Sequence, residues 1–253
     1  MPELKDLTII ISSKADEIGI NKTLNSILEV SPGELRLLLV LSDYQSEQVS
    51  RLSNQIQGWD AEIKLVPAEG IYRAQNTGLR EAKTEFVMFI NGGDELFSIQ
   101  NLELLLRGMN GFEWGYGELL MVSSSSVKRT YSFQYKQLLH RLGVKFVPHP
   151  STVLRRSTAL DLGGYDETFE SAADHKLLLE FSKLSRPFIL NECISTFYLG
   201  GVSTRSNVEI VGDCRLISQE LFGNFVPNWR VEKTIWELNL LLRNTIKLIN
   251  RFS

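Results

Sequence analysis

The residues best suited to chemistry lie in the segment 70–96 of the sequence. An apolar run at 86–90 predicts a buried parallel strand, and the tetrapeptide Asn-Gly-Gly-Asp at 91–94 follows it directly. Ligands of open α/β sheets bind at the carboxyl ends of the strands, and glycine lets the backbone approach a ligand closely. The carboxylate of Asp94 would suit a divalent cation that bridges a phosphorylated ligand. The tetrapeptide alone is also typical of a simple turn.

Alternating strands and helices are expected to bring more polar side chains to the same edge. The predicted strands are 7–11, 35–41, 63–66 and 86–90, and the predicted helices between them are 21–30, 46–57 and 71–82. With short connections, this alternation implies a parallel sheet with right-handed crossovers. Ser12 and Asp43 then follow the first two strands as Asp94 follows the fourth. This convergence favours a binding site over a simple turn, and we expect Asn21 to cap the first helix.

The second half of the chain has a looser pattern. A helix is expected near 100–108, and strands at 118–122 and 130–133 are expected to flank a polar loop. A later helix carries Asp174 in its first turn, where the helix dipole favours an anion. We find no internal repeat and no low-complexity linker in the sequence.

Size and composition indicate an ordinary globular protein. A chain of 253 residues can form one substantial α/β core with a small appendage. Hydrophobic residues make up 43 % and charged residues 23 %, and the net charge of −3 gives no reason to expect nucleic acid as a partner. The two cysteines, Cys193 and Cys214, lack metal-ligand spacing and are expected to be free thiols in a reducing compartment rather than a disulfide.

The two ends of the sequence bear on location. The first residues lack the basic and then apolar profile of a signal peptide, and no apolar run reaches the ~18 residues that a membrane span needs. We therefore expect a cytoplasmic protein.

Segment 229–252 has apolar residues at helical spacing and a net charge of +3, from five basic and two acidic residues. Such a helix suits peripheral attachment to the inner face of the membrane, and the alternative is packing on the catalytic domain or on a second subunit, so an oligomer stays open.

Several segments together resemble a known family, the inverting nucleotide-sugar glycosyltransferases of type-A fold that are often called family 2. The matching segments are 7–11, 22–27, 42–46, 70–79, 91–94, 148–156, 163–167 and 172–174. Each is weak alone, but they follow the family's order across roughly 7–203. The match is closest to enzymes of bacterial surface-polysaccharide synthesis.

The resemblance implies a fold and a domain organisation. The fold would be α/β of glycosyltransferase type A, with a Rossmann-like, mostly parallel sheet and flanking helices. A catalytic domain at 1–203 would consist of a nucleotide-binding half, about 1–96, and an acceptor half, about 97–203. A C-terminal helical extension would occupy 204–253.

The resemblance also implies donor-binding residues. Asp94 would hold Mn²⁺ or Mg²⁺, which stabilises the departing nucleoside diphosphate as charge develops on it. Asp43 would accept a hydrogen bond from the nucleotide base. Further donor contacts are expected from Ser12, Arg73, Asn76 and Asn91. Arg73 stands where the family commonly has an aspartate, and this charge reversal suggests an acidic sugar in the donor.

On the acceptor side, the resemblance implies that Asp174 is the general base. It would take the proton of the acceptor hydroxyl during in-line attack, which inverts the anomeric carbon; its alternative role is to stabilise the first helical turn. His149, between two prolines, and Arg205 are expected to contact the acceptor or the donor. The alternatives are a structural hydrogen bond for His149 and a plain surface position for Arg205.

The predicted function is transfer of a sugar from a nucleoside diphosphate donor to a hydroxyl of a glycan or lipid-linked acceptor, in bacterial polysaccharide biosynthesis. The metal motif lacks a second acidic residue, and the first strand lacks the aromatic that usually stacks on the base. A catalytically weak, nucleotide-sugar-binding scaffold is therefore the alternative. A nucleotidyltransferase ranks last, because the segment after the first strand is not a glycine-rich, basic phosphate loop.

Overall fold

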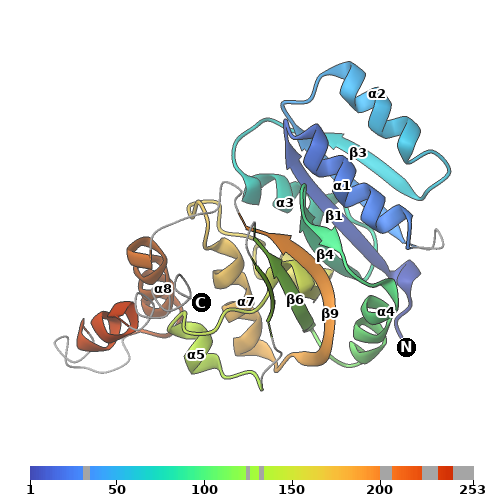
Figure 1. Ribbon diagram of the computed structural model, residues 1–253. Helices are drawn as coiled ribbons and strands as arrows, with labels where there is room; N and C mark the ends of the chain where they lie inside the picture. Colours follow the sequence, from blue (N-terminus) through green and yellow to red (C-terminus); the bar gives the residue numbers. More distant parts are fainter. Residues whose placement is uncertain (31–34, 124–125, 131–133, 200–206, 224–232, 242–253) are drawn as a thin grey trace.

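The computed structural model has a nine-stranded sheet with helices on both faces (Figure 1). It describes residues 1–30, 35–123, 126–130, 134–199, 207–223 and 233–241. The strands follow the order β3 (Ala61–Leu65), β2 (Arg36–Ser42), β1 (Leu7–Lys14), β4 (Phe86–Asn91), β8 (Thr152–Arg155), β6 (Trp114–Val122), β9 (Phe188–Tyr198) and β5 (Glu95–Leu96), and β7 (Val127–Thr130) pairs with β6.

The strands of the first half run parallel to one another. β1 lies between β2 and β4, and Ser12 is in register with Val40 on one side and Asn91 on the other. β8 is antiparallel to both β4 and β6, and so it joins the parallel half to the strands of the second half. The predicted α/β fold with a mostly parallel sheet is confirmed.

Apolar side chains on both faces of the sheet build two cores. Ile9 and Ile11 face one core, and Ile10 faces the other, because successive side chains of a strand alternate. The first core contains side chains of α1 (Glu17–Leu28), α2 (Ser46–Gln55) and α4 (Ile99–Gly108). The second contains side chains of α3 (Ile71–Glu81), α6 (Arg156–Asp161) and α7 (Ala173–Leu184). Burial on both faces explains why these strands read as continuous apolar runs.

Some elements begin or end elsewhere than the sequence predicts. β1 continues to Lys14, so Ser12 lies within the strand rather than after it. α1 begins at Glu17, and its cap is Asp16, whose carboxylate accepts from the N–H of Gly19; the prediction that Asn21 caps it is wrong. β6 begins at Trp114 rather than at 118. β7 occupies 127–130, whereas 131–133 lie outside the described residues.

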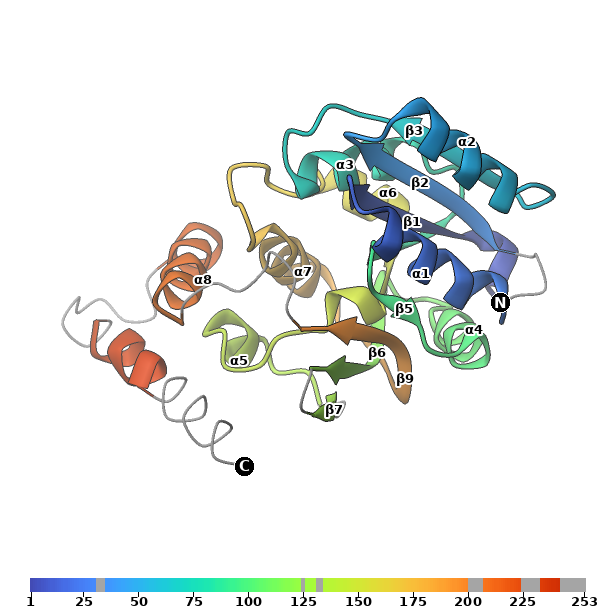
Figure 2. The same ribbon diagram turned by 45° about the horizontal axis from the view of Figure 1, so that its top comes forward.

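A helical extension packs beside α7 (Figures 1 and 2). It comprises α8 (Asn207–Phe222) and a helix at 233–241, and the short helix α5 (Gln137–Arg141) contacts both α7 and α8. Trp236 is buried against Val211 and Cys214, and Asn239 donates a hydrogen bond to the carbonyl of Leu142. This part of the C-terminal segment therefore packs on protein.

Two 3₁₀ helices complete the described elements, η1 (Leu4–Asp6) and η2 (His149–Ser151). Cys193 and Cys214 are both buried, and neither is part of a disulfide among the described residues. Within the described part of the chain, every helix is too short or too polar to cross a bilayer.

Candidate active site

Two neighbouring cavities lie at the carboxyl ends of the parallel strands. The first, here the strand-end cavity, has a volume of about 450 Å³ and is lined by Ser12, Lys14, Ser42 and Gly70, among others. The second, here the Asp174 cavity, has a volume of about 290 Å³. Its lining includes Tyr72, Asn91, His149 and Asp174. Ile71, Glu170 and Ser171 line both cavities, so the two share a wall.

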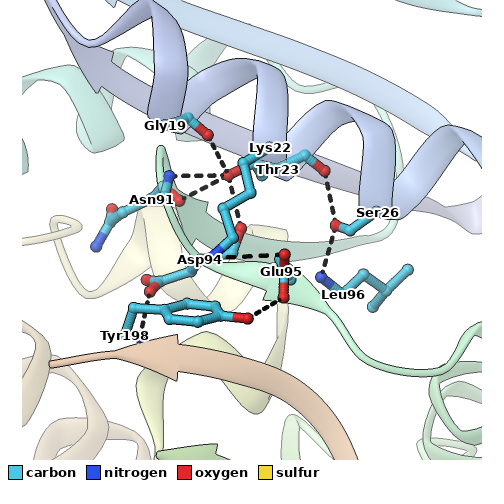
Figure 3. A network of polar contacts seen from close by, with 10 residues as sticks. Gly19, Lys22, Thr23, Ser26, Asn91, Asp94, Glu95, Leu96 and Tyr198 are labelled. Carbon is cyan, nitrogen blue, oxygen red and sulfur yellow. Dashed lines mark hydrogen bonds and ion pairs between the residues drawn. The ribbon is translucent and has the colours of Figure 1, made fainter. Parts of the chain in front are cut away.

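The turn that carries Asp94 is held by α1 (Figure 3). The hydroxyl of Thr23 donates to the carbonyl of Asp94 at 2.6 Å and accepts from the N–H of Gly93 at 3.0 Å. The hydroxyl of Ser26 accepts from the N–H of Leu96 at 3.0 Å. Gly93 has a φ of +103°, a conformation that other residues rarely adopt. The glycines of the motif thus serve the turn, and α1 fixes its position.

The carboxylate of Asp94 is buried, with 5 % of the residue exposed. It accepts a hydrogen bond from the N–H of Tyr198 at 3.3 Å. Burial raises the pKa of Asp94 to about 7, against the opposing effects of this hydrogen bond and of Lys22. Lys22 itself lies 2.8 Å from the centroid of the Tyr198 ring and 3.6 Å from the carboxylate of Glu95 (Figure 3).

Asp94 is buried and lines neither of the two cavities. Among the described residues, no group of three or more His, Cys, Asp and Glu side chains forms a ready-made metal site. Mg²⁺ is nevertheless often held by one or two carboxylates together with substrate phosphates. A carboxylate whose pKa is raised by burial gains from a nearby positive charge. One carboxylate is chemically suited to contribute a ligand to Mg²⁺ or Mn²⁺, but its position outside both cavities adds no support, and the metal stays a prediction.

Asp174 lies in the first turn of α7, within reach of a tyrosine from α3. The hydroxyl of Tyr72 donates to the carboxylate of Asp174 at 3.0 Å. Burial and the charge of Asp174 raise the pKa of Tyr72, so the phenol stays a donor. The rings of Tyr72 and Tyr165 stack with centroids 5.5 Å apart. Asp174 is thus oriented by a side chain that is 102 residues away in sequence.

His149 belongs to the same cluster. Its Nε2 and the hydroxyl of Tyr165 are 2.7 Å apart, and its ring stacks on Phe89. Burial lowers the pKa of His149, which keeps the imidazole neutral at pH 7. The structure thus brings His149 and Asp174 to one cavity, and the hydrogen bond to Tyr165 favours a structural role for the imidazole.

Of the predicted donor contacts, Ser12 lines the strand-end cavity, and Asp43 directly follows Ser42, which also lines it. The hydroxyl of Ser12 is buried and has no hydrogen-bond partner among the described residues. Asp43 adopts a φ of +58°, and its half-exposed carboxylate lies 3.7 Å from the ammonium group of Lys14. Backbone strain of this kind often accompanies ligand sites. Ser12 and Asp43 therefore remain candidates for contacts with a nucleotide.

The other predicted donor contacts have partners within the protein. Asn76 donates to the carbonyl of Tyr165 and to Glu167, both at 2.8 Å, and its amide oxygen accepts from the N–H of Tyr165. Arg73 forms a half-exposed ion pair with Glu69 at 2.8 Å, and the acidic sugar stays a prediction.

Two further predicted contacts remain. Asn91 lines the Asp174 cavity and accepts from Gln75 at 3.1 Å. Arg205 lies outside the described residues.

Sequence reasoning missed the side chains that position the two key carboxylates. These are Thr23 and Tyr198 for Asp94, and Tyr72 for Asp174. Thr23 and Tyr72 fall within segments that resemble the family, but a sequence offers no signal for the partner of a distant side chain. The one hint for Tyr72 in the sequence was its place in the first turn of the helix that follows Gly70.

Comparisons with known proteins agree on the fold. No model of a protein family matches the chain, and no curated protein sequence matches it significantly. The structure of S. aureus TarS 1–349 in complex with UDP-GlcNAc matches with a TM-score of 0.67 and 16 % identity, covering 92 % of this chain and 71 % of that one. The complex of TarS 1–349 with UDP matches with a TM-score of 0.65 and 16 % identity, covering 92 % and 70 %.

A third structure, of a longer S. aureus TarS chain, has a TM-score of 0.63 at 17 % identity. The match covers 90 % of this chain and 42 % of that one, so this chain spans less than half of the longer protein. Identity this low bears on the fold and leaves the activity open. The structural similarity and the sheet topology together show that the chain has the glycosyltransferase type-A fold.

Proposed function

We propose that this protein is an inverting, family 2-like glycosyltransferase that uses a nucleoside diphosphate sugar. The observation that carries the proposal is the pair of adjoining cavities at the carboxyl edge, one of which is lined by Asp174. TarS, a glycosyltransferase of the same fold, has been solved with UDP and with UDP-GlcNAc, which supports a nucleotide sugar as the ligand.

The donor nucleotide would occupy the strand-end cavity. The buried hydroxyl of Ser12 would gain a hydrogen-bond partner there, and Asp43 could accept from a base N–H. Gly70 lines the same cavity immediately before α3 begins, and the free N–H groups of a helix N-terminus favour phosphates.

Asp94 would hold the metal. When bound, Mn²⁺ or Mg²⁺ would supply positive charge to the departing diphosphate. The protein's own contribution is orientation, because Thr23 and the N–H of Tyr198 fix the backbone and the carboxylate of Asp94. α1 and β9 thus hold the metal ligand from two sides.

Asp174 would act as the general base. As the acceptor oxygen bonds to the anomeric carbon, the bond from that carbon to the diphosphate oxygen breaks, and the hydroxyl proton passes to the carboxylate of Asp174. A single displacement inverts the configuration. Tyr72 would orient this carboxylate through its hydrogen bond.

We also propose that the acceptor is a hydroxyl of a glycan or of a lipid-linked molecule. The protein would then work at the cytoplasmic face of a bacterial membrane. Leu238 and Leu241 are 60 % and 62 % exposed, on the side of their helix opposite the buried Trp236 and Asn239. This apolar side could meet a membrane while the other side packs on protein. Flotation with anionic vesicles should decrease in the double variant Leu238→Glu/Leu241→Glu, and unchanged flotation would reject this contact.

Donor hydrolysis tests the proposal. We would supply UDP-, GDP-, dTDP- and CMP-sugars with Mn²⁺, Mg²⁺ or a chelator, to the wild type and to Asp94→Ala and Asp174→Asn. We expect turnover of donors with one nucleotide, dependent on metal and reduced at least ~100-fold in both variants. Asp161→Asn, an exposed change on α6, serves as the control. Nucleotide binding without turnover would favour the scaffold alternative.

A further inference from the structure

The Asp174 cavity is completed by the helical extension. Ile210, Asp213 and Cys214 of α8 and His140 of α5 line it opposite the residues of the catalytic cluster. α5 and α8 lie beside α7 in both overall views (Figures 1 and 2). Through α8, the cavity that holds the proposed base therefore takes part of its wall from outside the region that resembles the family.

The walls of this cavity suit a sugar ring. Tyr72, Phe146 and Phe197 contribute aromatic rings, and Phe146 is 40 % exposed. Small-molecule sites combine aromatic and aliphatic walls with polar groups that orient the ligand. The volume of about 290 Å³ falls at the small end of such pockets, as expected for one sugar residue.

One buried polar atom in the wall lacks a partner. His140 lines the cavity, and its Nδ1 lies 2.8 Å from the hydroxyl of Tyr135. Its Nε2 is buried and has no hydrogen-bond partner among the described residues. Buried polar atoms are nearly always hydrogen-bonded in native proteins. A sugar hydroxyl in the cavity is a group that would satisfy this nitrogen.

The charge of the lining has one sign. Asp174, Glu170 and Asp213 line the cavity, and no Lys or Arg does so among the described residues. Burial lowers the pKa of two imidazoles in the lining, His140 and His149, so these two add little positive charge. Asp174 and Glu170 alone would place two negative charges beside a bound ligand. Among the described residues, no lysine or arginine of the lining would balance these charges.

We propose that the Asp174 cavity binds the acceptor sugar, and that this sugar is neutral or carries an amino group. This inference rests on the proposed function and names the substrate class of its acceptor site. A carboxylate or phosphate on the bound sugar would face Asp174 and Glu170 as a like charge, which selects against acidic acceptors. The diphosphate of a lipid-linked acceptor would have to lie outside the cavity.

Matched pairs of glycosides test the inference. We would measure binding to the full chain, by ligand-observed NMR, of the nitrophenyl glucoside with its glucuronide and the galactoside with its galacturonide, together with the glucosaminide. Each neutral or amino glycoside should bind at least about tenfold more tightly than its acidic counterpart, a difference of about 1.4 kcal/mol. Equal or tighter binding of the acidic member would overturn the proposal, and so would binding of none of them.

A variant of Glu170 tests whether the charge of the lining causes the preference for neutral glycosides over acidic ones. Glu170→Gln removes one carboxylate and leaves Asp174 in place, so the preference for the neutral member should shrink at least about twofold. Glu47→Gln, on an exposed position of α2 away from the cavity, should keep the wild-type preference. An unchanged preference in Glu170→Gln would contradict the charge argument.

The failure of this inference is distinguishable from failure of the proposed function. Donor hydrolysis by the same preparation tests the transferase independently of the acceptor. If the donor is consumed but the acidic glycosides bind better, only the acceptor inference fails. If neutral glycosides bind but no nucleotide sugar is consumed, the inference about the cavity holds and the transferase fails.

Discussion

Asp174 stands in the first turn of a helix, where a carboxylate can serve the helix alone. Its surroundings add a second function. The hydroxyl of Tyr72 donates to it at 3.0 Å, and Tyr72 is itself held by stacking on Tyr165. A carboxylate that merely stabilised a helix end would not need a buried phenol to orient it. At the scale of single residues, the orientation of Asp174 is therefore the feature on which the proposed activity depends most directly.

Tyr72→Phe tests this orientation. The variant keeps the stacked ring and removes the hydrogen bond, so kcat should fall about tenfold while KM for the donor changes little. Tyr116→Phe removes a hydroxyl from a core tyrosine that lines neither cavity and should leave both constants unchanged. An unaltered kcat in Tyr72→Phe would reject the positioning role.

Asp166 gives a residue-scale prediction about pH. Burial opposes its ionisation, but hydrogen bonds from Lys176 and Thr168 outweigh this effect and lower the pKa of Asp166 to about 2. Because the unfolded value is near 3.8, its contribution is complete above about pH 5 and is lost as the pH falls toward 2. Asp166→Asn should lower the free energy of unfolding at pH 7 by about 2 kcal/mol and flatten its decline between pH 5 and 2.

Chemical denaturation at several pH values measures both effects. Glu220→Gln is the matched comparison, because Glu220 also pairs with Lys176 but is 53 % exposed, and it should cost less stability. A wild-type pH slope in Asp166→Asn would contradict the assignment.

The sequence supports the choice of Asp94 and Asp174 better than it supports their environments. Both carboxylates lie within short segments that resemble the glycosyltransferase family and follow its order along the chain. Local composition also predicts the turn at 91–94. Tyr72 and Tyr198 act through contacts between elements that are distant in sequence. Such contacts depend on how helices and strands pack, which no local pattern encodes.

At the scale of elements, α1 supports the turn at 91–94 that carries Asp94. The hydroxyl of Thr23 has partners on both sides, the carbonyl of Asp94 and the N–H of Gly93. A helix that covers the sheet thus also determines where the proposed metal ligand lies. The buried hydroxyl links the packing of α1 to the geometry of the site.

Thr23→Val tests this link. Valine has a similar shape but cannot bond the turn, so the buried carbonyl of Asp94 and N–H of Gly93 lose a partner, and stability should fall by ~1–3 kcal/mol. Metal-dependent donor turnover should fall as well. Thr77→Val on α3 should change stability by less than about 0.5 kcal/mol, because the exposed hydroxyl bonds only within its own helix, to the carbonyl of Arg73 and with the guanidinium of Arg80. Equal effects of the two changes would contradict the account.

Element boundaries show where local patterns fail. The parallel strands were predictable because burial on both faces makes them apolar throughout. The start of β6 was not, because its glycines resemble a loop. They are required by close packing instead: a Cβ on Gly115 would lie 2.9 Å from the carbonyl oxygen of Phe188. Similarly, α1 begins earlier than predicted because Asp16 caps it.

At the scale of the whole molecule, the helical extension has a small core of its own, apart from the two cores of the sheet. Trp236 is 3 % exposed and packs with Val211 and Cys214. The sequence left open whether this segment contacts protein or membrane. The described helix at 233–241 contacts protein with one side and leaves Leu238 and Leu241 exposed on the other.

Trp236→Ala should therefore destabilise the protein. Removing a buried tryptophan typically costs ~3–5 kcal/mol, and a peripheral site belongs at the lower end of that range. Leu238→Ala on the same helix, 60 % exposed, should change stability by less than about 0.5 kcal/mol. Thermal unfolding of the two variants compares them directly, and equal melting temperatures would show that the extension does not pack as described.

The most direct test of the account is single-turnover consumption, by Asp174→Asn, of the donor that the wild type hydrolyses. Calorimetric binding of the matching nucleoside diphosphate provides the reference. We expect the rate to fall at least ~100-fold while nucleotide affinity stays within about twofold of the wild type. A wild-type rate in Asp174→Asn, or loss of nucleotide affinity together with the rate, would contradict the assignment of Asp174 as the base.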